Sequence, residues 1–262
     1  MNYEHIILER KGNIATLTLN RPEKLNAINE KMIEELSSAM TRVGQDRESR
    51  VLVITGAGRA FCSGADVSDM AKAAAGATME IRYRTQMVHR TILAMTELEK
   101  PVIAKVNGVA VGIGCSLALS TDMIIASENA QFSLIFSQIG LIPDGGSLFH
   151  LPRLVGPAKA KELIFTARKV EAKEAERIGL INKAVPAENL DNEVDTLTRQ
   201  LAEGPTVAFG MAKKIMNKGL SMDLSSVLEC EASGQALAGT TEDAREGVMA
   251  FLEKRKPQFK GK

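Results

Sequence analysis

The sequence of 262 residues has little cysteine, few aromatic residues and almost no excess charge. Its three cysteines are odd in number and widely spaced, so neither a disulfide framework nor a CxxC zinc site is indicated, and a reducing, cytoplasmic location is expected. Tryptophan is absent, aromatic residues make up 4%, and the formal net charge is +1. A base-stacking platform and a basic surface for nucleic acid are therefore both disfavoured.

Long apolar runs and metal-binding patterns are also missing. No stretch of about 18 or more apolar residues is present, so no membrane-spanning helix is predicted. The first residues, MNYEHIILERKGN, carry charges where a signal peptide is apolar. The three histidines have no paired spacing, so no metal site is expected. The remaining composition, 45% hydrophobic and 25% charged, is ordinary for a globular protein of one large domain or one domain with a small appendage.

Apolar periodicity predicts an α/β fold that ends in helices. Strands are expected over 4–10, 14–19, 51–55, 101–106 and 123–126, with 180–185 extended. Helices are expected after an N-cap at Asn29, over 78–98, from Pro157 to about 167 and over 171–178. From about 187 the pattern is helical throughout, and Thr240 with Asp243 resembles a capping box for a last helix over 241–254. The chain therefore divides into an α/β core, 1–199, and a C-terminal helical region, 200–262.

Two of the predicted strands run into stretches of small residues. Strand 51–55 is followed by Cys62-Ser63-Gly64-Ala65-Asp66, and the strand that ends at 106 is followed by the glycine-rich segment 108–115. Small residues let backbone N–H groups approach a ligand, and two such donors on one oxygen form an oxyanion hole. Tight turns alone also explain either bend, and sequence position does not show that the two meet. A phosphate-binding loop is disfavoured because neither G-x-G-x-x-G nor GK[ST] is present.

With their neighbours, these bends resemble the enoyl-CoA hydratase/isomerase, or crotonase, family. The matching segments are LNRPEKLNAI (19–28), GRAFCSGADV (58–67), KPVIAKVNGVAVGIGCSLAL (100–119), DMIIASENAQF (122–132) and GLIPDGGS (140–147). The resemblance implies a spiral of ββα units with a C-terminal helical oligomerisation region, assembled as homotrimers or as hexamers made of two trimers. It implies an acyl-CoA thioester as the substrate, with coenzyme A as part of that substrate and no separate cofactor.

The resemblance also implies a site. The backbone N–H groups of Ala65 and Ile113 would hold the thioester oxygen, provided that the Ile113 side chain points away, because many relatives carry glycine there. The Lys24 side chain, by itself, is equally well explained as a solvated surface lysine. The implied contacts along the coenzyme A groove and around the acyl end are Lys24, Leu25, Ala27, Gly64, Asp66, Val67, Gly112, Ser116, Phe136 and Pro143. The loop 68–78 is expected to set part of the acyl pocket.

Two departures from the family pattern bear on the chemistry. Family hydratases use two glutamates, and the corresponding positions here are Ser116 and Phe136. One carboxylate remains nearby, Asp144, and its apolar neighbours should raise its pKa by desolvation. A raised pKa suits a group that takes and returns a proton near neutral pH. Asp144 is otherwise explained as a helix cap or a turn residue.

An aspartate in this position occurs in dienoyl- and ring-type enoyl-CoA isomerases of the family. The chain is most similar in motif to the phenylacetate-pathway isomerases that act on 1,2-epoxyphenylacetyl-CoA. A single base is sufficient for a 1,3-proton shift, because the group that removes the α proton can return it at the γ carbon. The sequence therefore favours an enoyl-CoA isomerase with Asp144 as its one acid/base.

Other interpretations stay open. A hydratase or hydrolase of the same family would use Asp144 to activate water, and a catalytically weak relative would bind only coenzyme A or RNA. The near-zero net charge disfavours RNA, and retention of Asp144 with both donor bends disfavours a dead enzyme. Asp69 is a possible second acid. Four further residues are expected to be structural: His89, His150, Cys62 and Cys115.

Overall fold

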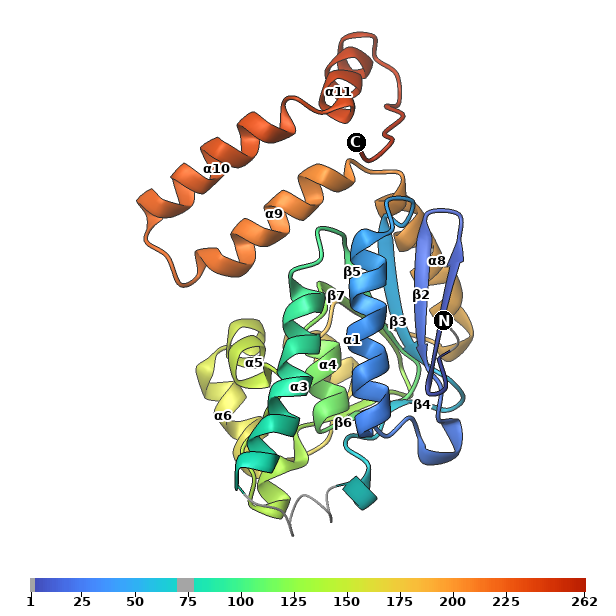
Figure 1. The fold of residues 1–262 in the computed structure, drawn as a ribbon, viewed down its shortest axis with the longest axis vertical. Coiled ribbons are helices and arrows are strands. Elements are labelled where there is room, and N and C mark those ends of the chain that lie inside the picture. The colour runs from blue at the N-terminus through green and yellow to red at the C-terminus, as the bar shows by residue number, and fades with distance from the viewer. Residues whose placement is uncertain (1–2, 70–77) are drawn as a thin grey trace.

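The structure, a computed structural model, describes residues 3–69 and 78–262 (Figure 1). Its centre is a six-stranded sheet in the order β1-β2-β3-β5-β7-β10. The strands are β1 (Ile6–Lys11), β2 (Ile14–Leu19), β3 (Val51–Gly56), β5 (Val102–Val106), β7 (Met123–Ser127) and β10 (Lys183–Val185). β1 and β2 form an antiparallel hairpin, and every other pair in this sheet is parallel. The predicted strands are thus confirmed, with ends that shift by a few residues.

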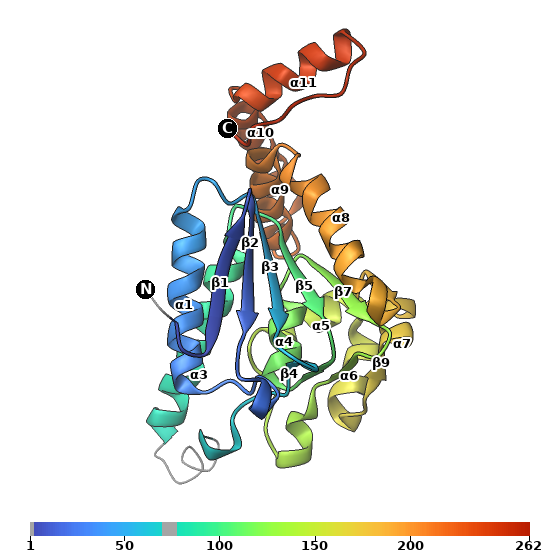
Figure 2. The same ribbon diagram turned by 90° about the vertical axis from the view of Figure 1, so that its right-hand side faces the viewer.

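Helices cover both faces of this sheet because the side chains of its central strands alternate between two apolar cores. Leu52 and Ile54 of β3 belong to the core that contains α1 (Glu30–Gln45) and α3 (Thr78–Thr96). Val51 and Val53 pack with α8 (Leu190–Ala202) on the opposite face. Figure 2 shows α1 and α8 on opposite sides of the sheet. All of β3 is buried, as expected of an apolar run between two helical layers.

A second, smaller sheet lies beside the first and was not predicted. It joins β4 (Ala60–Cys62), β6 (Val109–Val111), β8 (Gln131–Ser133) and β9 (Val170–Glu171), in that order. β3, β5 and β7 of the large sheet are each followed by one of these short strands, so the chain repeats a ββ unit as it winds. This repetition, with the helices between units, is the expected spiral of ββα turns.

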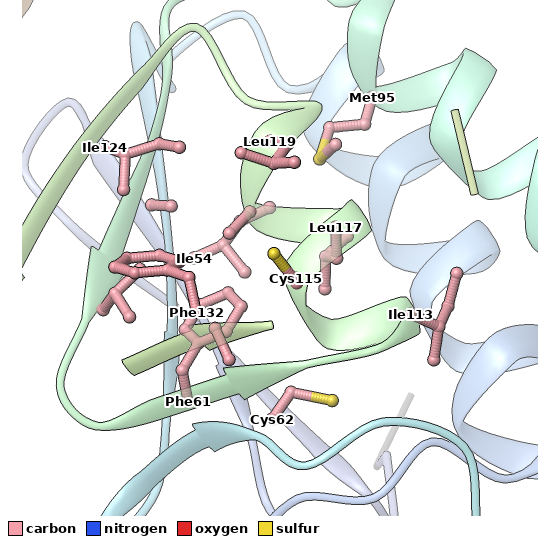
Figure 3. Packing of buried hydrophobic residues seen from close by; sticks show 14 of the residues in the cluster. Ile54, Phe61, Cys62, Met95, Ile113, Cys115, Leu117, Leu119, Ile124 and Phe132 are labelled. Atoms are coloured by element: carbon pink, nitrogen blue, oxygen red, sulfur yellow. The ribbon is translucent and has the colours of Figure 1, made fainter. Parts of the chain in front are cut away.

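The short helix α4 (Ile113–Leu119) fills the space next to the small sheet. All seven of its residues are buried. Its side chains belong to the same core as Phe61 of β4 and Phe132 of β8, and Figure 3 shows Cys115 turned toward Phe132. The other helices before the C-terminal arm are α5 (Ser147–Val155), α6 (Pro157–Thr166) and α7 (Ala172–Arg177), with the 3-10 helices η1 (Pro22–Lys24), η2 (Ile135–Ile139) and η3 (Ala187–Asn189).

The last three helices extend away from the core as an arm (Figures 1 and 2). They are α9 (Thr206–Gly219), α10 (Leu224–Ala238) and α11 (Glu242–Leu252). The arm is attached through Lys213 of α9, whose ammonium lies 2.8 Å from the Asp122 carboxylate and is largely buried. The division into 1–199 and 200–262 stays a prediction, and α8 still packs on the sheet up to Ala202.

One predicted cap is wrong by one residue. α11 begins after Thr241, whose hydroxyl accepts a hydrogen bond from the Ala244 N–H at 3.0 Å. The carboxylate of Asp243 does not close a capping box with Thr240, because it accepts the N–H groups of Lys260 and Gly261 from the chain end. In the described parts of the chain, no helix combines the length and apolarity needed to cross a membrane. No cluster of three or more potential metal ligands occurs among those residues either.

Candidate active site

The two glycine-rich bends meet in the folded chain. Gly64 has φ +109° and Gly112 has φ +53°, conformations that favour glycine. A Cβ built on Gly112 would lie 3.9 Å from the Cα of Gly64, and one built on Gly64 would lie 3.2 Å from the Val111 carbonyl oxygen. Gly114 is equally constrained, because its Cβ would fall 2.6 Å from the Cβ of Cys62. The backbone on either side of the contact is therefore held at close range by residues without side chains.

The Ala65 N–H group is directed away from its strand neighbour. Ile28 donates its N–H to the Gly64 carbonyl at 2.8 Å, and its own carbonyl accepts the Asp66 N–H at 2.9 Å. In such a parallel bridge the residue between the two bonded positions, here Ala65, turns its N–H to the other side. Within the described residues nothing accepts this N–H, and Ala65 is exposed. A free, outward-facing donor results.

The Ile113 N–H group is the second donor. Ile113 is the first residue of α4, where backbone N–H groups have no partner within the helix and carry its partial positive charge. Gly112 donates to the Ser133 carbonyl at 2.8 Å, whereas no described residue accepts the Ile113 N–H. The Ile113 side chain is 6% exposed and lies in the core, so it leaves the donor uncovered (Figure 3). The Ile113 side chain therefore points away from its own N–H group, as the predicted role of that N–H requires.

Asp144 has a carboxylate oxygen without a partner. Its Oδ1 is buried and makes no hydrogen bond with any described residue. Burial raises the pKa of Asp144, while the charge of His89 and a hydrogen bond to its own backbone act in the opposite direction. The backbone carbonyl of Asp144, not its side chain, accepts the Ser147 hydroxyl at 2.8 Å and the Ser147 N–H at the start of α5. The helix-cap interpretation of the carboxylate is thus wrong.

The loop that carries Asp144 is packed directly against α4. A Cβ on Gly145 would overlap the Cδ1 of Ile113 and fall 3.0 Å from the Cβ of Ser116. The Ser120 hydroxyl lies 2.8 Å from the Ser116 carbonyl and 3.3 Å from the Gly145 carbonyl. Asp144 is therefore the immediate neighbour of Gly145, which contacts Ile113, the residue of the second donor.

His89 and His150 border the same loop from two helices. The Cδ2 of His150 would lie 3.2 Å from a Cβ on Gly146, and the Cγ2 of Ile92, on α3, 3.5 Å from it. His89 precedes Ile92 by about one turn of α3, and its charge lowers the pKa of Asp144. Interpreting His89 as structural misses this coupling, which local sequence gives no signal for.

The two positions that hold glutamates in family hydratases lie around the same point. Ser116 is fully buried, and its hydroxyl donates to the Gly112 carbonyl at 3.3 Å, so it offers a ligand no exposed surface here. The Phe136 ring, on η2, reaches within 4.0 Å of a Cβ position on Gly112. Pro143 is buried beside them. Asp144 is the one carboxylate among these positions.

The predicted coenzyme A groove begins at η1, where Lys24 is exposed and Ala27 is buried. Leu25 has φ 50° and Asn26 φ 57°, both left-handed. Asn26 holds this conformation: its amide donates to the carbonyls of Ala57 at 2.9 Å and Ala60 at 2.8 Å. Sequence reasoning missed Asn26, although a fully buried polar residue within an apolar motif is a recognisable structural anchor once burial is known.

The remaining predicted residues fall into two groups. Val67 is 78% exposed on the open side of the bend, whereas both carboxylate oxygens of Asp66 already have protein partners. Asp69 accepts the Glu30 N–H at 3.1 Å and so caps α1, which disfavours it as the second acid. Of the loop expected to set the acyl pocket, residues 70–77 lie outside the described part of the chain.

Cys62 and Cys115 are packing residues, as expected. Both are buried, and desolvation raises the pKa of each thiol to about 12. A thiol with such a pKa stays protonated at neutral pH and is inert as a nucleophile.

Comparison with known proteins identifies the family of the chain. The enoyl-CoA hydratase/isomerase family profile matches residues 9–262. The chain is 42% identical to the crotonyl-CoA hydratase of Syntrophomonas wolfei and 40% identical to the 1,2-epoxyphenylacetyl-CoA isomerase of Escherichia coli, over 99% of both chains in each case. It matches the crystal structure of an enoyl-CoA hydratase from Bacillus anthracis with a TM-score of 0.93 and 33% identity, over 99% of this chain and 100% of the other. The protein belongs to the enoyl-CoA hydratase/isomerase family.

Proposed function

We propose that the protein is an enoyl-CoA isomerase in which Asp144 carries a proton between two carbons of an acyl-CoA thioester. The observation that carries this proposal is the buried, unpartnered Oδ1 of Asp144, on a loop that packs on Ile113, together with two backbone N–H groups that no described residue uses. A carboxylate oxygen without a protein partner is available to a substrate proton, and free donors are available to a substrate oxygen. Neither feature serves the stability of the fold.

The mechanism follows from these groups. The N–H groups of Ala65 and Ile113 donate to the thioester oxygen and stabilise the negative charge that develops on it. The Asp144 carboxylate takes the α proton, which leaves a dienolate whose charge rests on that oxygen. The protonated Asp144 then returns a proton at the γ carbon, and the double bond moves by one position. The raised pKa of Asp144 favours both steps, because it strengthens the base and still allows release.

A hydratase is the second candidate, because the Syntrophomonas wolfei relative is named a crotonyl-CoA hydratase. Hydration needs one group to take a proton from the attacking water and one group to donate a proton to the α carbon. Ser116 and Phe136 stand where family hydratases hold their glutamates, so Asp144 would have to perform both tasks. Isomerisation needs only one carboxylate that acts twice on the same face, which is why we favour it. Neither reaction requires a separate cofactor, because coenzyme A is part of the substrate.

A panel of 2-enoyl, 3-enoyl and ring acyl-CoA substrates tests the assignment, with products separated by chromatography and weighed by mass spectrometry. Isomerisation leaves the mass unchanged, whereas hydration adds one water. We expect interconversion of 2- and 3-enoyl-CoA to be faster than hydration, and both to be lost in Asp144→Asn. A hydrated product that forms faster than the isomer would contradict the isomerase proposal and favour a hydratase.

We also propose that the arm mediates assembly into trimers or hexamers. No residue of α10 is buried, and Leu224, Leu228 and Leu237 on it are all more than half exposed. Exposed apolar side chains in this number on one helix favour contact with another chain.

A further inference from the structure

Arg21 and Asp66 form an ion pair between the two segments that border the Ala65 donor. The Arg21 Nη2 lies 2.9 Å from the Asp66 Oδ2, and the two side chains are only 12% and 13% exposed. The other guanidinium nitrogen of Arg21, Nη1, donates to the Ala27 carbonyl at 2.7 Å. One side chain therefore holds both the segment 24–28 and the residue that follows Ala65.

Both oxygens of the Asp66 carboxylate are in use. Oδ2 accepts from Arg21, while Oδ1 accepts the Ser68 N–H at 3.0 Å and the Ser68 hydroxyl at 2.7 Å. These hydrogen bonds, with the Arg21 charge, lower the pKa of Asp66 to about 2. The carboxylate is thus ionised throughout the neutral range. Each of its oxygens already has a protein partner, which favours a role in holding the backbone.

The ion pair spans the backbone bridge that orients the Ala65 N–H. Only two hydrogen bonds form that bridge, from Ile28 to Gly64 and from Asp66 to Ile28. The segment before Ile28 is irregular, because Leu25 and Asn26 both have left-handed backbone. One further backbone hydrogen bond, from the Ser63 N–H to the Leu25 carbonyl at 3.0 Å, joins the same two segments. The direction of the Ala65 N–H therefore depends on these three bonds and on the side chains that tie both segments together.

We propose that Arg21 and Asp66 are positioning residues, whose ion pair fixes the direction of the Ala65 N–H toward the thioester oxygen. This inference rests on the proposed use of that N–H as an oxyanion donor. Arg21 suits the task, since its planar group bonds Asp66 and Ala27 at once, which a single lysine ammonium cannot do with the same geometry. A shift of the donor by a fraction of an ångström weakens its bond to a developing charge more than it weakens binding of the neutral substrate.

Asp66→Asn tests the proposal with little other disturbance. Asparagine keeps an acceptor for the Ser68 N–H, so the change removes mainly the charge pair with Arg21. Arg21→Lys is the second variant, because it keeps the positive charge and loses the fork. Glu193→Gln is the matched control: it removes the pair between Lys183 and Glu193, 2.6 Å apart and remote from the site, with the same change in net charge.

Three quantities are measured for each variant: kcat and KM on the enoyl-CoA that the wild type converts fastest, the Kd values of butyryl-CoA and free coenzyme A by calorimetry, and the melting temperature. We expect kcat to fall about 10- to 100-fold in Asp66→Asn, with KM changed less than about threefold. Affinity for butyryl-CoA should fall by no more than about threefold, in line with KM, while that for free coenzyme A stays constant, since only the thioester carries the oxygen. Arg21→Lys should lie between wild type and Asp66→Asn, and Glu193→Gln should match wild type.

A purely structural pair gives a different result. It would lower the melting temperature of Asp66→Asn while kcat of the folded protein stayed at the wild-type value, and that outcome overturns the proposal. Equal losses of affinity for butyryl-CoA and free coenzyme A also overturn it, because they place the effect in the nucleotide groove. If Asp66→Asn does not fold, Arg21→Lys decides by the same criteria. If the wild type converts no enoyl-CoA, the isomerase proposal fails, while the two Kd values still decide whether the pair acts on the thioester.

Discussion

Replacing Asp144 by asparagine should reduce activity and increase stability in the same protein. The substitution keeps the shape of the side chain and removes its ionisable group. Loss of the proton carrier should slow isomerisation by at least about 100-fold, the lower end of what a positioned acid/base supplies. Binding of the acyl-CoA should hardly change, because the Ala65 and Ile113 N–H groups are untouched.

The gain in stability follows from the environment of the carboxylate. Oδ1 is buried without a hydrogen bond, and a charged group in that state costs more free energy than the neutral amide that asparagine would leave there. The pKa of Asp144 is raised in the folded state, so its ionised form destabilises the fold relative to the unfolded chain. At pH 8 we therefore expect Asp144→Asn to unfold with a free energy about 1–2 kcal/mol higher than wild type, which is a few degrees in melting temperature.

The stability gain of Asp144→Asn over wild type should grow as the pH rises. Below the ordinary carboxyl pKa, about 4, Asp144 is protonated in both the folded and unfolded states, and the burial of charge costs nothing. As the pH rises toward the raised folded-state pKa, the wild type loses stability because Asp144 would ionise in the unfolded chain before it does in the fold. Above that pKa the loss of stability is complete. The difference between Asp144→Asn and wild type should therefore be small at about pH 4 and reach its full size on the alkaline side of the folded-state pKa.

Urea unfolding from pH 4.5 to 9 measures this difference, with Asp195→Asn, an exposed carboxylate on α8, as the control for a lost charge. The control should show no comparable pH-dependent gain. An Asp144→Asn protein that is less stable than wild type at pH 8 and retains full isomerase activity would refute the reasoning. It would mean that the Asp144 side chain supports the turn and carries no proton.

Three further predictions follow from the same structure. Ala65→Pro removes one backbone donor and should lower turnover by about 100- to 1000-fold in a protein that stays folded; unchanged kinetics would place the donor elsewhere. His89→Gln removes a charge that lowers the pKa of Asp144, so the acidic limb of the kcat/KM profile should move to higher pH. A limb at the same pH would show that the two groups are uncoupled. Sedimentation should give the mass of a trimer or hexamer, and Leu228→Glu should reduce it; a wild-type monomer of 28.3 kDa would contradict the role of the arm.

The large sheet was predictable because its strands are long enough to show a pattern. Strands β2, β3, β5 and β7 are each five or six residues long, and most are apolar and nearly fully buried. The small sheet was not predictable, since β4, β6 and β8 have three residues each and their pairing partners are distant in sequence. Helix α4 also escaped, because a helix buried on every side has no polar face to reveal its period.

The residues of the candidate site were likewise predictable only in part. Ala65 and Ile113 came from motif resemblance, and the pKa of Asp144 followed from its apolar neighbours. His89 was missed because its coupling to Asp144 joins a helix to a loop far along the chain. Thr241 was mistaken for its neighbour Thr240, since two adjacent threonines are equally good caps in sequence and only the backbone distinguishes them.

The buried amide of Asn26 has a consequence for how this protein can diversify. It fastens the coenzyme A segment to the start of the small sheet, so the shape of that end belongs to the folded protein before any ligand arrives. Ile139, Leu141 and Ile142, next to Asp144, are more than half exposed and make no such anchor. In the proposed binding mode, the constant part of every substrate meets a rigid surface, and the variable part meets side chains that can be exchanged without disturbing the fold. New acyl specificities are accessible by changing one end of the site while the other end is inherited intact.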